Sequence, residues 1–165
     1  DGDLTLTYPK TSSLSGDYNF SMTDAYIEAW NHGDYYATGG NNWLVYVFPD
    51  CEVGTGEGFW LDIIAHDYSE ESIAGEYICK EDFETGVFSP GYMVAGIYYG
   101  SWYIDYENFQ PKGEKLAPII SGSIKITESE EGTAALSIEG VDDSGNKITC
   151  QITGDIDYYD ISDFE

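Results

Sequence analysis

The segment between Ser121 and Ile156 alternates apolar and polar residues in three successive runs. The apolar members of these runs are Ile120, Ile124 and Ile126, then Ala134, Leu136 and Ile138, and finally Ile148, Cys150, Ile152 and Ile156. Residues 128–132 and 142–146 separate the runs with acidic, Gly, Asn and Ser residues, which favour the backbone conformations of hairpin turns. A period of two buries one face of a strand and exposes the other. The segment therefore predicts three antiparallel strands.

The rest of the chain has the same strand-like character. The apolar runs at 43–48 and 59–65 are short and rich in Val and aromatic residues, which favours strands buried on both faces. Amphipathic helices longer than one or two turns are not predicted anywhere. These features predict an all-β, antiparallel two-sheet β-sandwich, with a flattened calycin-like β-barrel as the alternative. We expect a single domain over residues 1–165, with 1–12 as an extended arm and 157–165 as an acidic tail.

The parity of the apolar residues predicts the core. Its expected members are Phe20, Trp43, Val45, Val47, Leu61, Ile63, Trp102, Ile104, Ile124, Ile126, Leu136, Ile138, Ile148, Cys150 and Ile152. Cys150 is most simply a small core residue. A disulfide between Cys51 and Cys79 stays an open alternative.

The charge of the chain excludes several classes of partner. It has 31 acidic and 6 basic residues, giving a net charge of −25. Nucleic acids and anionic membrane surfaces both require clustered Lys and Arg, so neither is expected as a partner. The chain has no run of the ~18 apolar residues that a transmembrane helix needs, so no transmembrane segment is expected.

The excess of carboxylates raises the question of a cation site. Asp142 and Asp143 lie in a predicted turn, and Asp155 and Asp157 lie in the last strand. These four residues could supply oxygen ligands to calcium, although their spacing is not that of an EF-hand. The competing interpretation, which we favour, is a solvated acidic coat. No other cofactor is expected.

Recognisable catalytic motifs are absent, so whether the protein is an enzyme is uncertain and a negative answer is favoured. His32 and His66 have no neighbouring sequence typical of a catalytic triad. Asp105 and Glu107 lie on one face of a predicted strand, about 7 Å apart, a separation that overlaps the range of an inverting glycosidase pair. A solvent-facing acidic surface explains this pair more simply, and no catalytic residue is assigned.

Aromatic residues form 16% of the chain and include 15 Tyr. Several of them flank predicted turns, where consecutive side chains must point to different sides. We therefore predict Tyr35, Tyr36, Tyr99 and Tyr103 as exposed rings that contact a ligand. Flat apolar rings beside hydrogen-bond acceptors are suited to the faces of sugars.

Five short segments carry a resemblance to a known group of proteins. They are residues 32–43 (HGDYYATGGNNW), 73–77 (IAGEY), 99–103 (YGSWY), 121–126 (SGSIKI) and 142–148 (DDSGNKI). In this order they resemble β-rich domains of uncharacterised secreted and surface lipoproteins from Bacteroides-type gut bacteria. The resemblance implies an exported protein at the outer membrane surface or in the periplasm, with a lipid anchor in the full-length precursor. It supplies no catalytic residues.

The function that these features favour is a non-catalytic cell-envelope or secreted binding module, whose partner is a glycan or an envelope or host protein. Two alternatives stay open. One is a hydrolase that uses an Asp/Glu pair, and the other is a purely structural or adhesin-type surface domain.

Overall fold

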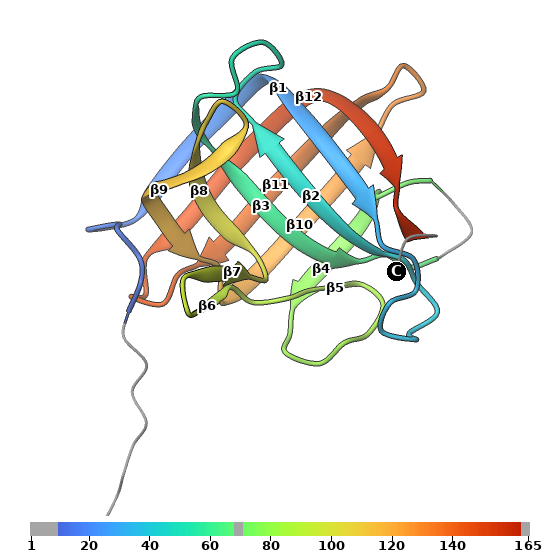
Figure 1. Cartoon of the computed structure of the whole chain (residues 1–165), viewed down its shortest axis with the longest axis horizontal. Helices are drawn as coiled ribbons and strands as arrows, with labels where there is room; N and C mark the ends of the chain where they lie inside the picture. Colours follow the sequence, from blue (N-terminus) through green and yellow to red (C-terminus); the bar gives the residue numbers. More distant parts are fainter. Residues whose placement is uncertain (1–9, 68–70, 163–165) are drawn as a thin grey trace, which may run out of the picture.

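The computed structural model describes residues 10–67 and 71–162, which form β-strands joined by turns (Figure 1). The predicted all-β class is confirmed. The strands are β1 (Tyr18–Asn31), β2 (Asn42–Phe48), β3 (Gly56–Ile64), β4 (Gly75–Cys79), β5 (Val87–Phe88), β6 (Tyr92–Val94), β7 (Ile97–Tyr99), β8 (Trp102–Glu107), β9 (Gln110–Pro118), β10 (Ser121–Glu128), β11 (Thr133–Val141) and β12 (Lys147–Asp160).

The main sheet closes into an eight-stranded barrel in the order β1-β12-β11-β10-β4-β5-β3-β2. The barrel closes where β1 pairs in parallel with β12, from Tyr18 opposite Ile148 to Asn31 opposite Asp160. Figure 1 shows these two strands side by side, in blue and red. The predicted two-sheet sandwich is therefore wrong, and the barrel alternative describes the architecture. A period of two occurs in both folds, so it could not distinguish them; the pairing of the two ends of the chain does.

Inward-facing side chains fill the barrel with one apolar cluster. Of the predicted core residues, all are buried except Phe20, which is partly buried and stacks on Tyr18 with ring centroids 4.6 Å apart. Val45, Leu61 and Ile138 are completely buried and come from three different strands. The alternation of the sequence thus identifies the buried residues of the strands, although Trp102 and Ile104 of β8 are buried outside the barrel.

A second apolar cluster lies outside the barrel, where β8 and β9 extend the sheet from the first half of β3. Trp102, Ile104 and Tyr106 of β8 belong to this cluster, whereas Tyr103 points into the barrel core. The Tyr106 hydroxyl donates a hydrogen bond to the Phe59 carbonyl at 2.6 Å. Strand β8 is consequently buried on both faces.

The predicted terminal segments lie partly outside the described residues. The arm at 1–12 lies largely outside the described residues, and Ser13 donates its N–H to the Leu116 carbonyl at 2.7 Å. The tail at 157–165 is shorter than predicted because β12 continues to Asp160; residues 163–165 lie outside the described part. Within the described ranges, no helix has the length and apolar character needed to cross a membrane.

Candidate functional site: an aromatic surface on the barrel

Two loops bring three aromatic rings to the surface. Tyr35 and Tyr36, between β1 and β2, are in edge-to-face contact with centroids 5.0 Å apart. Tyr36 stacks on Phe83 with centroids 4.0 Å apart and planes inclined by 6°. Tyr35 is 63% exposed and Phe83 is 52% exposed. The Asp34 carboxylate holds the first loop in shape by accepting the Thr38 N–H at 2.7 Å.

The hairpin formed by β6 and β7 carries a second stacked pair. Tyr92 lies directly opposite Tyr99, and their rings stack with centroids 5.1 Å apart and planes 13° apart. Val94 and Ile97, the next outward pair, are also exposed. Tyr98 points the other way and packs on the second apolar cluster. The hairpin is therefore anchored on one face and presents an apolar face to solvent.

The loops and the hairpin belong to one surface. Burial raises the pKa of Tyr36 to about 12, and the Asp62 carboxylate contributes to the rise. Asp62 of β3 joins the two parts: the Asn42 side chain at the end of the first loop donates to its carboxylate. On the hairpin side, the Ser89 N–H donates to the Asp62 carbonyl and the Asp62 N–H donates to the Ser101 hydroxyl. We call this surface the aromatic strip; its members are Tyr35, Tyr36, Phe83, Tyr92 and Tyr99.

A further set of rings covers the outside of the barrel on β12, β1, β2 and β3. Trp30 of β1 stacks on Tyr159 of β12 with centroids 4.4 Å apart. Tyr46 of β2 contacts Trp60 of β3 with centroids 5.5 Å apart. These rings alternate with inward-facing aliphatic residues, so the same periodicity that fills the core places them outside. We call this set the outer wall; its members are Tyr26, Trp30, Tyr46, Trp60 and Tyr159.

Asp62 lies between the strip and the wall. Its Oδ1 accepts a hydrogen bond from the Asn42 side-chain amide at 2.7 Å. Burial raises the pKa of Asp62, against the opposing effects of the Asn42 hydrogen bond and the His32 charge. On the outer face of the barrel, Asp62 pairs with Leu44 of β2, and Leu44 pairs with Trp30 of the wall. The two aromatic groups therefore share a partly buried carboxyl group.

The structure brings together three of the four predicted ligand tyrosines. Tyr35, Tyr36 and Tyr99 are all in the aromatic strip. The prediction that Tyr103 is exposed is wrong, because only 1% of its surface is accessible. Its hydroxyl donates to Glu57, which also accepts the Tyr18 hydroxyl at 2.8 Å. Tyr103 thus belongs to the interior of the fold.

Asp142 and Asp143, two of the predicted calcium ligands, hold the chain before β1 in place. Burial would raise the pKa of Asp142, but hydrogen bonds from Ser12 and Asn146 lower it. Its Oδ1 accepts the Asn146 N–H at 2.7 Å, and Asp143 accepts the Thr11 N–H at 2.7 Å. Both carboxylates therefore already accept hydrogen bonds from other residues of the protein.

The other two predicted calcium ligands lie elsewhere. Lys147, the first residue of β12, directly follows the turn that carries Asp142 and Asp143. Asp155 is eight residues further along β12, roughly 25 Å away. Asp157 accepts a hydrogen bond from the Tyr26 hydroxyl at 2.9 Å. The structure therefore does not gather the four aspartates into one site. Among residues 10–67 and 71–162, no group of three or more His, Cys, Asp or Glu side chains is placed to hold a metal ion.

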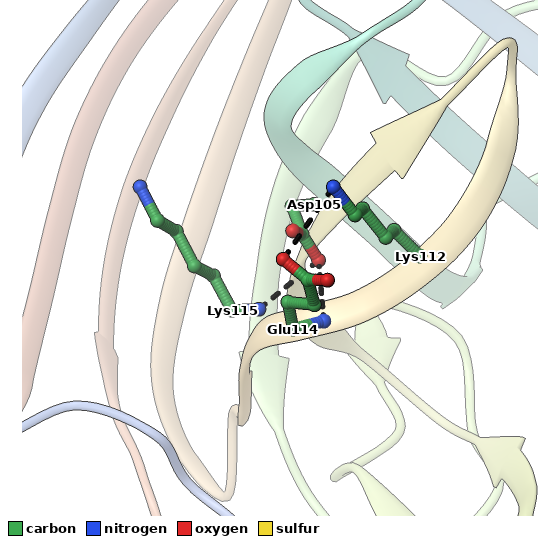
Figure 2. A network of polar contacts seen from close by, with 4 residues as sticks. All are labelled: Asp105, Lys112, Glu114 and Lys115. Atoms are coloured by element: carbon green, nitrogen blue, oxygen red, sulfur yellow. Dashed lines mark hydrogen bonds and ion pairs between the residues drawn. The ribbon is translucent and has the colours of Figure 1, made fainter.

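Asp105, which the sequence analysis paired with Glu107, accepts hydrogen bonds from the backbone of the neighbouring strand β9 (Figure 2). Its Oδ1 accepts the N–H groups of Glu114 and Lys115 at 3.0 and 3.1 Å, where the β8–β9 register shifts. Lys112 and Glu114 form an ion pair beside it at 3.4 Å. Asp105 is buried whereas Glu107 is exposed, so the expectation of a shared solvent-facing acidic surface is wrong.

A separate hollow of about 870 Å³ lies over β4, β10 and β11. Lys80 and Lys125 line it, but they pair with Glu84 at 2.8 Å and with Glu76 at 3.8 Å. His66 at its edge contacts the Glu76 carbonyl at 3.1 Å. Each of the two lysines is therefore already paired with a carboxylate, and Glu139 is a third acidic residue of the lining.

The three cysteines are free, so Cys51 and Cys79 do not form a disulfide. Burial raises the pKa of Cys79 and of Cys150 to about 12. Both thiols consequently stay protonated at neutral pH, which makes them poor nucleophiles.

No family model, curated protein or solved structure matches this chain.

Sequence reasoning missed Phe83, Tyr92 and Asp62 as members of the surface. Phe83 lies in an acidic loop, and Asp62 interrupts an apolar run, so neither has a local signal of its own. Tyr92 could have been found, because Ala95-Gly96 between two short aromatic runs is typical of a hairpin.

Proposed function

We propose that this protein is a non-catalytic, secreted or cell-envelope binding module that holds a glycan against the aromatic strip. The observation that carries the proposal is the two ring stacks at the surface, Tyr36 on Phe83 and Tyr92 on Tyr99. Phe83, Tyr92 and Tyr99 are exposed, and Tyr36 is half-buried. Contiguous exposed apolar groups of this kind mark interaction sites.

The chemistry of the strip fits a sugar better than a purely apolar partner. The ring faces offer flat apolar surface for the C–H face of a pyranose. Asp62 adds a hydrogen-bond acceptor at the end of the loop that carries Tyr36, where the buried Asn42 amide holds it in place. Carboxylates accept hydroxyl donors strongly. A few polar groups within an apolar surface are what gives a binding site its orientation and specificity.

The location of the protein belongs to the same proposal. The resemblance to envelope lipoproteins supports export to the outer membrane surface or the periplasm, with a lipid anchor in the precursor. An envelope or host protein that presents such a glycan is the corresponding macromolecular partner.

A hydrolase is the second candidate function, and Asp62 is the observation that favours it. A raised pKa is what a general acid requires at neutral pH. A glycosidase also needs a second carboxyl group on the other side of the scissile bond. Glu28 and Asp62 instead lie on the same outer face of the barrel, so we favour binding without cleavage. Release of shorter sugars from a bound oligosaccharide would establish the hydrolase.

A glycan array with the purified protein, followed by calorimetric titration of the best ligand, tests the proposal. Tyr36→Ala and Tyr92→Ala should each weaken binding about tenfold, as central aromatic contacts do. Ile78→Ala is the matched control, because Ile78 is an apolar residue on β4 that is as exposed as Tyr92; this variant should bind like the wild type. The proposal fails if the array is blank, or if both tyrosine variants bind as tightly as Ile78→Ala. Failure of the array would favour the purely structural or adhesin-type alternative.

A further inference from the structure

Two acidic residues lie side by side on neighbouring strands of the outer wall. Glu28 of β1 and Asp157 of β12 are directly opposite in the parallel register. Both point away from the core, because their neighbours Ile27, Ala29 and Ile156 are buried inside the barrel. Like charges placed directly opposite each other destabilise a sheet, so a cation between them would be favourable.

Neutral donors orient these carboxylates without cancelling their charge. The Trp30 indole N–H donates to Glu28 at 3.3 Å, and the Tyr26 hydroxyl donates to Asp157 at 2.9 Å. Residues 26–31, 42–48, 58–64 and 155–160, which build the wall, contain no Lys or Arg. In the described part of the chain, the ion pairs of the lysines are with Glu76, Glu84 and Glu114, none of which is on this wall.

Aromatic rings flank the carboxylate pair, which separates it from an ordinary acidic patch. Tyr26 and Trp30 lie two residues before and after Glu28, on the same face of β1. Tyr159 stacks on Trp30 and contacts the Tyr26 hydroxyl through its own hydroxyl at 3.3 Å. Ring faces attract an ammonium group, and Trp and Tyr do so most strongly.

We infer that Glu28 and Asp157, with the rings of Tyr26, Trp30 and Tyr159, bind an ammonium group of the ligand. This inference rests on the proposed function and specifies its ligand as an amine-bearing glycan, in which free amino groups alternate with apolar sugar faces. The strip and the wall are connected through Asp62, so one extended chain can contact both.

Two oligosaccharides that differ only in charge provide the test. A β-linked glucosamine oligomer and its fully N-acetylated counterpart of equal length present similar ring faces, but only the first carries ammonium groups. Calorimetric titration at about 20 mM NaCl should show the amine form binding about tenfold more tightly, and this preference should shrink at about 200 mM NaCl because salt screens exposed charges.

Charge-neutralising variants distinguish the effect of the Glu28–Asp157 pair on binding from the effect of the overall charge of −25. Glu28→Gln and Asp157→Asn should reduce the preference for the amine form and leave binding of the N-acetylated form unchanged. Glu139→Gln removes one charge from the outer face of β11 and is the matched control; it should retain the preference.

The outcomes distinguish this inference from the proposed function. Equal binding of the two oligosaccharides by the wild type overturns the inference and leaves the glycan-binding proposal intact. If Glu28→Gln and Asp157→Asn keep the preference for the amine form, as Glu139→Gln should, the preference comes from the overall charge of the protein. That result also overturns the inference. If the wild type binds neither these oligosaccharides nor any glycan on the array, both the inference and the proposed function fail.

Discussion

Gly154 is the most sensitive point of the parallel seam that closes the barrel. A Cβ atom placed on Gly154 would lie 2.0 Å from the carbonyl oxygen of Ala25 and 2.5 Å from its carbonyl carbon. These are backbone atoms of the neighbouring strand, so they cannot rotate away. The seam would have to open locally if Gly154 were replaced by Ala.

We expect Gly154→Ala to destabilise the fold by about 1–3 kcal/mol, as overpacking of this kind does. For a domain of this size, each kcal/mol lowers the melting temperature by about 2–4 °C, so the fall should be about 2–12 °C. Replacement of Gly by Ala also restricts the unfolded chain, which offsets about 0.4–1 kcal/mol. Thermal unfolding followed by far-UV circular dichroism measures the net effect.

Gly16→Ala is the matched control. A Cβ atom at Gly16 meets nothing within 4 Å. The variant shares the effect on the unfolded chain, so the difference between the two melting temperatures isolates the clash at the seam. If Gly154→Ala melts together with Gly16→Ala, the β1–β12 pairing at this register is refuted.

Three further predictions concern stability. Leu136→Ala should cost about 2–5 kcal/mol in guanidinium unfolding, since Leu136 is buried in the barrel core; an unchanged midpoint would contradict its inward orientation. Because the folded-state pKa of Asp62 is raised above 3.8, its contribution to stability is complete below that pH and is lost as pH rises through the folded pKa. The melting temperature of Asp62→Asn should therefore fall less than that of the wild type when the pH is raised from acid to neutral. Equal falls for the two proteins would contradict the raised pKa. Because the net charge is −25, the wild type should melt at a higher temperature in about 150 mM NaCl than at low salt. CaCl2 at equal ionic strength should add nothing to this, whereas a further rise would indicate a calcium site.

The sequence predicted the inner face of nearly every strand, because burial of alternate residues is a local property. Leu136, Ile138, Ile148 and Cys150 all lie where the alternation placed them. The sandwich was wrong because closure depends on β1 meeting β12 from the other end of the chain. Local alternation contains no information about that pairing.

The candidate site was predicted only in part, for a similar reason. Tyr35, Tyr36 and Tyr99 flank turns and were predicted to be exposed, but Phe83 and Tyr92 join them through tertiary contacts. Tyr103 was misassigned because β8 is buried on both faces, so that neither parity of its residues faces solvent. Asp142 and Asp143 were predicted as metal ligands because their hydrogen-bond donors, the Thr11 N–H and the Ser12 hydroxyl, are distant in sequence. The local sequence therefore does not show that these carboxylates have partners within the protein.

The most direct test of glycan binding at the aromatic strip is to map the bound ligand by NMR chemical-shift perturbation. The isotope-labelled protein is titrated with the best glycan from the array. If the glycan binds the aromatic strip, the largest shifts will fall at Tyr36, Phe83 and Tyr92. Shifts centred instead on Ile78 and Lys125, in the hollow over β4 and β10, would contradict it.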